Sequence, residues 1–110
     1  MTYDEGLAER IRVVIGADPA VAERKMFGGL AILLNGNMSV GIVGDELMVR
    51  VGPDAHADAL AHPHVREMDF TGKPMRGYVY VDGDGCAEDD DLAAWVERGL
   101  GFAGSLPPKR

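Results

Sequence analysis

The spacing of apolar residues predicts one helix near the start of the chain and a longer one near its end. Leu7, Ile11 and Ile15 recur every fourth residue with charged residues between them, which is the pattern of an amphipathic helix. Gly16 favours the end of this first helix. The last helix begins at an acidic run, residues 88–91, and carries a second apolar stripe made of Leu92, Trp95, Val96, Gly99 and Ala103.

The middle of the chain alternates short apolar runs with turn-forming residues, which predicts strands joined by hairpins. Asn35-Gly36 is a strong two-residue hairpin signal, and Gly28-Gly29 and Gly44-Asp45 indicate two further turns. Strands joined by links this short must be antiparallel neighbours in the sheet. A short helix is expected after Gly52-Pro53. The runs that we predict to be strands are 22–27, 30–34, 38–43, 47–51, 65–70 and 76–81.

This order of elements, α-β-β-β-β-α-β-β-α, predicts a two-layer α+β fold with an antiparallel sheet. The 110 residues correspond to one domain in length. We expect the domain to occupy residues 1–104, and residues 105–110 to form a flexible tail.

Both faces of the predicted sheet carry apolar side chains, which is unusual for an antiparallel sheet with one wet face. In the second strand Leu30 and Ile32 lie on one face, and Ala31 and Leu33 on the other. In the next two strands we place Met38, Val40 and Ile42 opposite Val43, and Met48 opposite Leu47, Val49 and Val51. Three short helices cover one face. The other face meets a second copy or a protein partner, or it is covered by a loop or by the last helix.

The composition narrows the classes of function. A hydrophobic fraction of 46% with 26% charged residues is typical of a globular protein, and the net charge of −7 argues against direct nucleic-acid binding. The longest apolar run, residues 30–34, is too short to cross a membrane. Cys86 is the only cysteine, and the acidic start of the chain does not resemble a secretory signal. We therefore expect a cytoplasmic protein without a disulfide.

Four motifs resemble ligand-binding or catalytic motifs, but each lacks a feature that its chemistry needs. The G-x-G-x-x-G letters at 99–104 fall at the end of a helix rather than at its start. Residues 82–85, Asp-Gly-Asp-Gly, begin like a calcium loop that the following residues do not complete. His56, His62 and His64 lack the spacing of a zinc site, and the acids Asp84 and Glu88 disfavour a Cys86 thiolate. We predict no catalytic residues, no metal and no cofactor.

Basic residues near the strands form the strongest candidate site. Because antiparallel pairing brings neighbouring strands together, these residues are candidates for binding an anion or a partner, with Gly28-Gly29 as a backbone nest. In the alternative, they form structural ion pairs with the acids Glu23, Asp45, Glu46 and Asp69. The predicted binding residues are Arg24, Lys25, Met26, Phe27, Gly28, Gly29, Arg50, Lys73, Arg76 and Tyr78.

The run Arg24-Lys25-Met26-Phe27-Gly28-Gly29 resembles a signature of the TfoX/Sxy N-terminal-domain family. Residues 30–38, 45–50, 68–70 and 77–81 support the likeness, which extends over roughly residues 3–106. The resemblance implies an antiparallel two-layer domain, similar to secretion-chaperone-type folds, and a role in bacterial regulation. It implies that two-domain members co-regulate natural competence with a catabolite-type transcription activator. This chain is expected to be a stand-alone member without the C-terminal domain.

Two hypotheses of function follow. The first is a non-enzymatic regulatory or protein-interaction module, acting as a homodimer or with a protein partner. The alternative is a domain that binds a small anionic ligand, or an uncharacterised enzyme, that uses the region of Arg24, Arg50 and Arg76.

Overall fold

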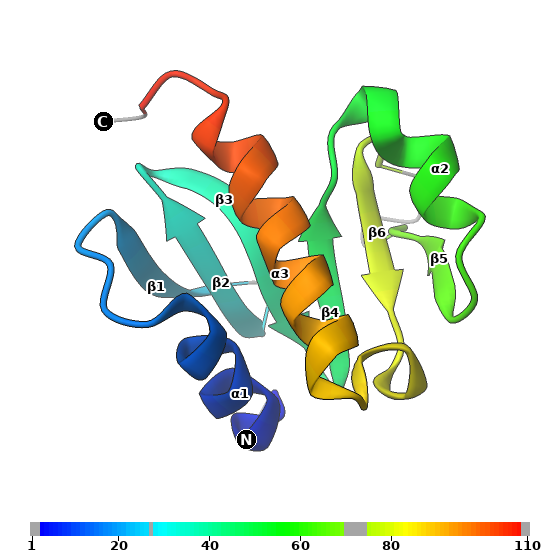
Figure 1. Ribbon diagram of the computed structural model, residues 1–110, viewed down its shortest axis with the longest axis horizontal. Helices are drawn as coiled ribbons and strands as arrows, with labels where there is room; N and C mark the ends of the chain where they lie inside the picture. The colour runs from blue at the N-terminus through cyan, green and yellow to red at the C-terminus, as the bar shows by residue number, and fades with distance from the viewer. Residues whose placement is uncertain (1–2, 27, 70–74, 109–110) are drawn as a thin grey trace.

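The computed structural model describes residues 3–26, 28–69 and 75–108 (Figure 1). It confirms the α+β class and the predicted order of helices and strands, with two short 3-10 helices in addition. The elements are α1 (Glu5–Ile15), β1 (Val21–Met26), β2 (Gly29–Leu34), β3 (Asn37–Val43), β4 (Glu46–Arg50), η1 (Pro53–Ala55), α2 (His56–Leu60), β5 (Val65–Glu67), β6 (Tyr78–Val81), η2 (Gly83–Cys86) and α3 (Asp89–Gly104).

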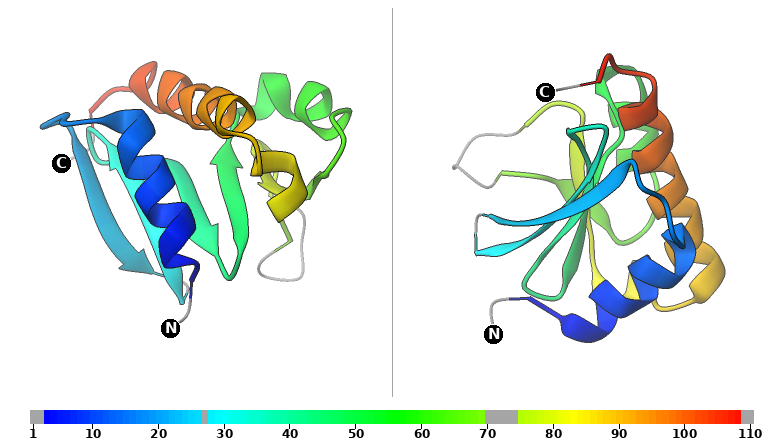
Figure 2. Two further views of the ribbon diagram at one scale, coloured as in Figure 1. Left: turned by 60° about the horizontal axis from the view of Figure 1, so that its bottom comes forward. Right: turned by 90° about the vertical axis from the view of Figure 1, so that its left-hand side faces the viewer.

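The described strands form one antiparallel sheet in the order β1-β2-β3-β4-β6-β5. The first four strands follow one another as hairpins, and β6 then pairs with both β4 and β5. Both views of Figure 2 place α1, α2 and α3 on the same side of this sheet. The molecule therefore has two layers, one of helices and one of strands.

Local signals in the sequence set several of these boundaries. The carboxylate of Asp4 accepts a hydrogen bond from the Leu7 amide at 3.1 Å and caps the start of α1. Asn35 and Gly36 both have positive φ, 53° and 82°, as the turn of a two-residue hairpin requires. In the described part of the chain, no helix is long and apolar enough to cross a membrane.

The main core lies between the helices and the first face of the sheet. All five residues of the predicted α3 stripe are buried, and α1 contributes Leu7, Ala8 and Ile11. Ala59 of α2 and Cys86 of η2 also belong to this core. The strands supply most of the rest, which includes Leu30, Ile32, Val40, Ile42, Leu47, Val49, Val79 and Val81.

Gly99 brings α3 unusually close to β3. A Cβ atom at this position would lie 2.5 Å from the carbonyl oxygen of Ser39 and 2.6 Å from Cγ1 of Val40. Both distances are far below a normal van der Waals contact. The helix therefore rests on the strand backbone at this point, and only a residue without a side chain fits.

A break in the register between β2 and β3 determines which face Met38 occupies. Val40 pairs with Ile32, but Met38 pairs with Leu33. Because neighbouring residues of a strand point to opposite faces, Met38 lies on the face opposite Val40. The prediction that Met38 shares a face with Val40 and Ile42 is therefore wrong, because unbroken alternation does not allow for a β-bulge.

A second, smaller apolar cluster covers the other face of the sheet, as the apolar residues on both faces predicted. We call this side of the sheet the second face. Among the described residues of this cluster, none belongs to a helix. Its buried members are Met48, Met68 and Tyr80, and its half-buried members are Met38, Val43, Met75 and Tyr78.

An ion pair attaches α1 to the edge strand β1. Two nitrogens of Arg12 donate hydrogen bonds to the two carboxylate oxygens of Glu23, at 2.7 and 2.8 Å. These bonds lower the pKa of Glu23, and together with Glu9 they raise the pKa of Arg12. Glu23 of β1 therefore forms its ion pair with a residue of α1.

The contact at Gly99 can be tested by substitution. Gly99→Ala is expected to lower the free energy of unfolding by about 1–3 kcal/mol, because the added methyl group overlaps the β3 backbone. The matched control is Gly101→Ala in the same helix, where a Cβ atom meets nothing within 4 Å. The control should be neutral or stabilising by up to about 1 kcal/mol. Urea unfolding followed by circular dichroism measures both, and equal midpoints would contradict this packing.

Candidate functional site

The second face of the sheet brings the strongest set of candidate residues together. The cross-strand pairs place Arg24, Ala31, Gly41, Met48 and Tyr80 in one row across five strands. Ala31 and Gly41 are small, so the row is lowest at these two positions and has longer side chains on both sides of them.

The centre of this face is closed, and its rim is half open. Met48 is 0% exposed, Met68 2% and Tyr80 5%. A Cβ atom on Gly41 would lie 2.8 Å from the terminal methyl carbon of Met48, so the Met48 side chain fills the low part of the row. Met38 and Met75 remain half-buried around it. The open apolar area is therefore smaller than strand alternation alone suggests.

Methionine supplies much of this surface. Four of the six methionines in the chain belong to the second cluster, and Met26 lies on the same face by its register opposite Gly29. Methionine is flexible and polarisable, and it is favoured at surfaces that adapt to different partners. The methionines can be counted in the sequence. That most of them share one face of the sheet becomes clear only when the strands are paired.

Arg50 lies at the rim of this face between two aromatic rings. Its guanidinium carbon is 5.5 Å from the ring centroid of Tyr78 and 5.3 Å from that of Phe102, both within the range of a cation–π contact. Tyr78 is its cross-strand partner, whereas Phe102 comes from α3. The two rings restrict the guanidinium but leave its N–H groups available as donors.

Two of the four acids that could have neutralised the basic residues, Glu23 and Glu46, are engaged elsewhere. Glu23 binds Arg12, and Glu46 binds Arg66, whose guanidinium also lies 4.5 Å from the ring centroid of Tyr80. Within the described part of the chain, no ion pair involves Arg24, Lys25, Arg50 or Arg76.

The other predicted binding residues do not form one cluster. Lys25 pairs with Leu30 and so points to the helix-covered face, opposite Arg24. Gly29 has a structural reason to be glycine, because a Cβ atom there would lie 2.0 Å from the Ile42 carbonyl oxygen. Arg76 is exposed. Gly28 lies in the turn between β1 and β2, and Phe27 and Lys73 lie outside the described residues.

The thiol of Cys86 is poorly placed for nucleophilic chemistry. Cys86 is 1% exposed, and burial is the main cause of its raised pKa, with Asp82 among the smaller ones. The sequence predicted the same direction but attributed it to Asp84 and Glu88. A buried thiol with a raised pKa holds little of the reactive thiolate.

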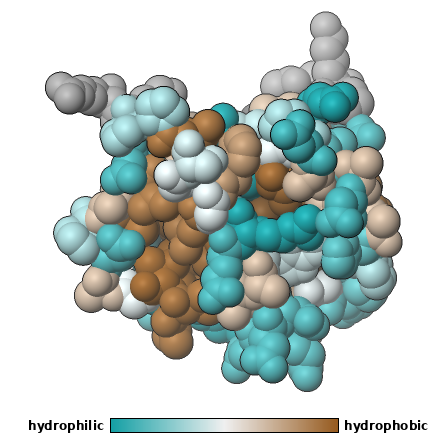
Figure 3. Space-filling model, turned by 45° about the horizontal axis from the view of Figure 1, so that its top comes forward, coloured by the Kyte–Doolittle hydropathy of each residue, from teal (hydrophilic) through white to brown (hydrophobic). Residues whose placement is uncertain are grey.

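The helix side of the molecule also exposes apolar atoms. In Figure 3 a continuous hydrophobic area lies just left of the centre of the view. Half-buried Val14, Ile15, Val21 and Leu100 pack against the main core on this side, and a cleft of about 390 Å³ lies between α1 and α3. Val13, at 81% exposure, is the one large apolar residue that is fully open among those described. No basic residue without an ion pair lines this cleft, because its Arg10 pairs with Asp89.

One comparison with known proteins identifies a relationship. The family model of the TfoX N-terminal domain matches residues 16–103. No curated protein and no solved structure matches the chain significantly.

Proposed function

Because the chain belongs to the TfoX N-terminal domain family, we propose that it is a regulatory module without catalytic activity that binds a protein partner through its second face. Membership of this family supports a regulatory or interaction-type domain in general. The observation that carries the finer proposal is the methionine-rich cluster, to which no described helix contributes. The proposed setting is the bacterial cytoplasm, with a role in the control of transcription.

The charges around this face favour an acidic partner. The chain as a whole has a net charge of −7, but Arg24 on the second face and Arg50 at its rim have no acidic partner among the described residues. A segment with apolar side chains flanked by carboxylates would pack on the methionine rim and pair with both arginines. We propose that such a segment is the occupant.

A second copy of the chain is the less favourable occupant. In a two-fold dimer the same surface is used by both subunits. The arginines of one subunit would therefore lie close to the arginines of the other. Like charges across an interface cost several kcal/mol. A homodimer through the second face remains a prediction that the same experiment decides.

Two adjacent residues of β1 make a matched pair for this test. Arg24 points to the second face and Lys25 to the helix side, and both are exposed. A photoreactive p-benzoylphenylalanine at position 24 should give a discrete cross-linked product in native host cells, and one at position 25 should not. Mass spectrometry should place the cross-link in an acidic, apolar segment of another protein. Arg50→Glu, combined with the probe at position 24, should abolish the product.

Three results would count against the proposal. Equal yields at positions 24 and 25 would mean that the contact is not specific to one face. No product at position 24 would mean that the face has no partner. A product that joins two copies of this chain would replace the acidic partner with self-association.

The stacked Arg50 supports a second candidate function, the binding of a small anionic ligand. A guanidinium held between Tyr78 and Phe102 loses little freedom when it binds a carboxylate or phosphate. On this hypothesis, millimolar citrate or ATP raises the melting temperature of the wild-type protein but not that of Arg50→Met, which keeps an apolar chain between the rings. No rise in the wild type, or an equal rise in both proteins, would rule it out.

A further inference from the structure

A histidine and two aspartates from distant parts of the sequence meet on the opposite half of the molecule from β1. His64 lies between α2 and β5, whereas Asp82 and Asp84 lie between β6 and α3. One ligand atom from each residue can be chosen so that all three lie within 4.8 Å of one another. We propose that His64, Asp82 and Asp84 form a binding site for a divalent transition-metal ion such as Zn²⁺ or Mn²⁺.

The fold holds the imidazole against the two carboxylates. The Asp82 amide donates a hydrogen bond to the His64 carbonyl oxygen at 3.0 Å, which ties the two segments together. Nδ1 of His64 lies 3.3 Å from Oδ1 of Asp82. A Cβ atom on Gly85 would lie 2.8 Å from Cβ of His64, so the glycine between Asp84 and Cys86 makes room for the histidine.

The distances are close to those of a metal centre. Ligand atoms about 2.0–2.2 Å from a tetrahedral ion lie roughly 3.3–3.6 Å apart. The His64 and Asp82 atoms already have this spacing, at 3.3 Å, and the exposed Asp84 side chain would have to close by at most about 1.5 Å to join them. A mixed set of one imidazole and two carboxylates favours Zn²⁺, Mn²⁺ or Fe²⁺ over Mg²⁺ and Ca²⁺, which prefer oxygen ligands alone.

The local charge also favours a cation. Within the described residues, Asp84 takes part in no ion pair, and the one pair of Asp82 is with His64. The acidic first turn of α3, Asp89–Asp91, follows a few residues later. Asp84, which has no basic partner among the described residues, and the nearby acids of α3 attract a positive ion.

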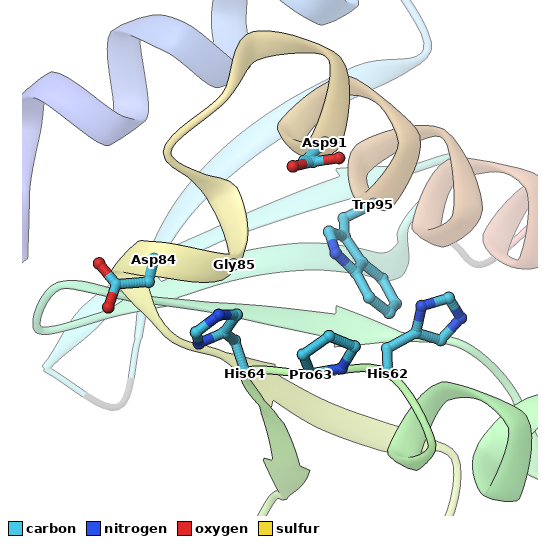
Figure 4. Close-up of a pocket in the computed structure, with 7 residues that line it drawn as sticks. All are labelled: His62, Pro63, His64, Asp84, Gly85, Asp91 and Trp95. Atoms are coloured by element: carbon cyan, nitrogen blue, oxygen red, sulfur yellow. The ribbon is translucent and has the colours of Figure 1, made fainter.

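A cavity lined by two of the three residues, His64 and Asp84, leaves room for further ligands. It has a volume of about 240 Å³ and is lined by His62, His64, Asp84, Asp91 and Trp95, among others. In Figure 4, His64 lies beneath the Asp84–Gly85 turn at one end, and His62 faces Trp95 at the other. Three protein ligands leave coordination positions open, so water or an anionic group in this cavity would complete the coordination of the ion.

The test compares two variants that each remove a ligand with one variant that removes only a charge. His64 has a positive φ of 68°, which glycine adopts readily, so His64→Gly removes the imidazole and should fold as well as the wild type. Asp84→Asn removes a carboxylate, and Asp90→Asn is its control, because it removes the same charge from an exposed residue outside the ligand set. Binding of ZnCl₂ to the chelator-treated protein is measured by isothermal titration calorimetry.

We expect one Zn²⁺ per chain, with an affinity that falls at least about tenfold in His64→Gly and in Asp84→Asn but not in Asp90→Asn. Substoichiometric Mn²⁺ should broaden the amide NMR signals of residues 64–65 and 82–85 before all others. Wild-type protein that takes up no Zn²⁺, or variants that bind it as tightly as wild type, would overturn the site. In that case the contact between His64 and Asp82 is only a surface ion pair.

Discussion

The close approach of α3 to β3 at Gly99 is the constraint on which the rest of the structure depends. It lets a long helix lie directly on the sheet, where Leu92, Trp95 and Val96 complete the main core. With α1 and α2 on the same side, the three helices bury one face of the sheet. The other face must then protect its apolar atoms without any help from a helix.

The second face does this with long, flexible side chains of its own. Met48 lies over the glycine of the neighbouring strand, and Arg66 covers the ring of Tyr80. Because methionine changes shape at low cost, such a surface can be closed in the free protein and still adapt to a partner. The neighbouring charges support this view, since Glu23 and Glu46 pair with Arg12 and Arg66 and not with Arg24 or Arg50.

Those parts of the fold that depend on local patterns could be predicted from the sequence. The Asn35-Gly36 hairpin, the buried stripe of α3 and the division of β6 into a valine face and a tyrosine face all follow from short-range periodicity or turn chemistry. The insertion of β6 between β4 and β5 could not be predicted, because it depends on pairing between distant strands. The bulge beside Met38 could not be predicted either, since one extra residue leaves no clear mark in the alternation.

The candidate sites divide in the same way. The basic residues and methionines are visible in the sequence, but which face each occupies depends on strand pairing and on the bulge, so Met38 proved to lie on the face of Met48 and not on that of Val40. The position of Phe102 against Arg50, and of His64 against Asp82, arises from contacts between segments far apart in the chain. Such contacts cannot be predicted from the spacing of residues in the sequence.

The central claim is that the free protein has a second face with a sealed centre and an accessible methionine rim. Methyl NMR of methionine-labelled protein, with a soluble paramagnetic probe added, tests it most directly. The account predicts that the signals of Met38 and Met75 broaden strongly and that those of Met48 and Met68 do not. Equal protection of all four methyl groups in the monomer would contradict it.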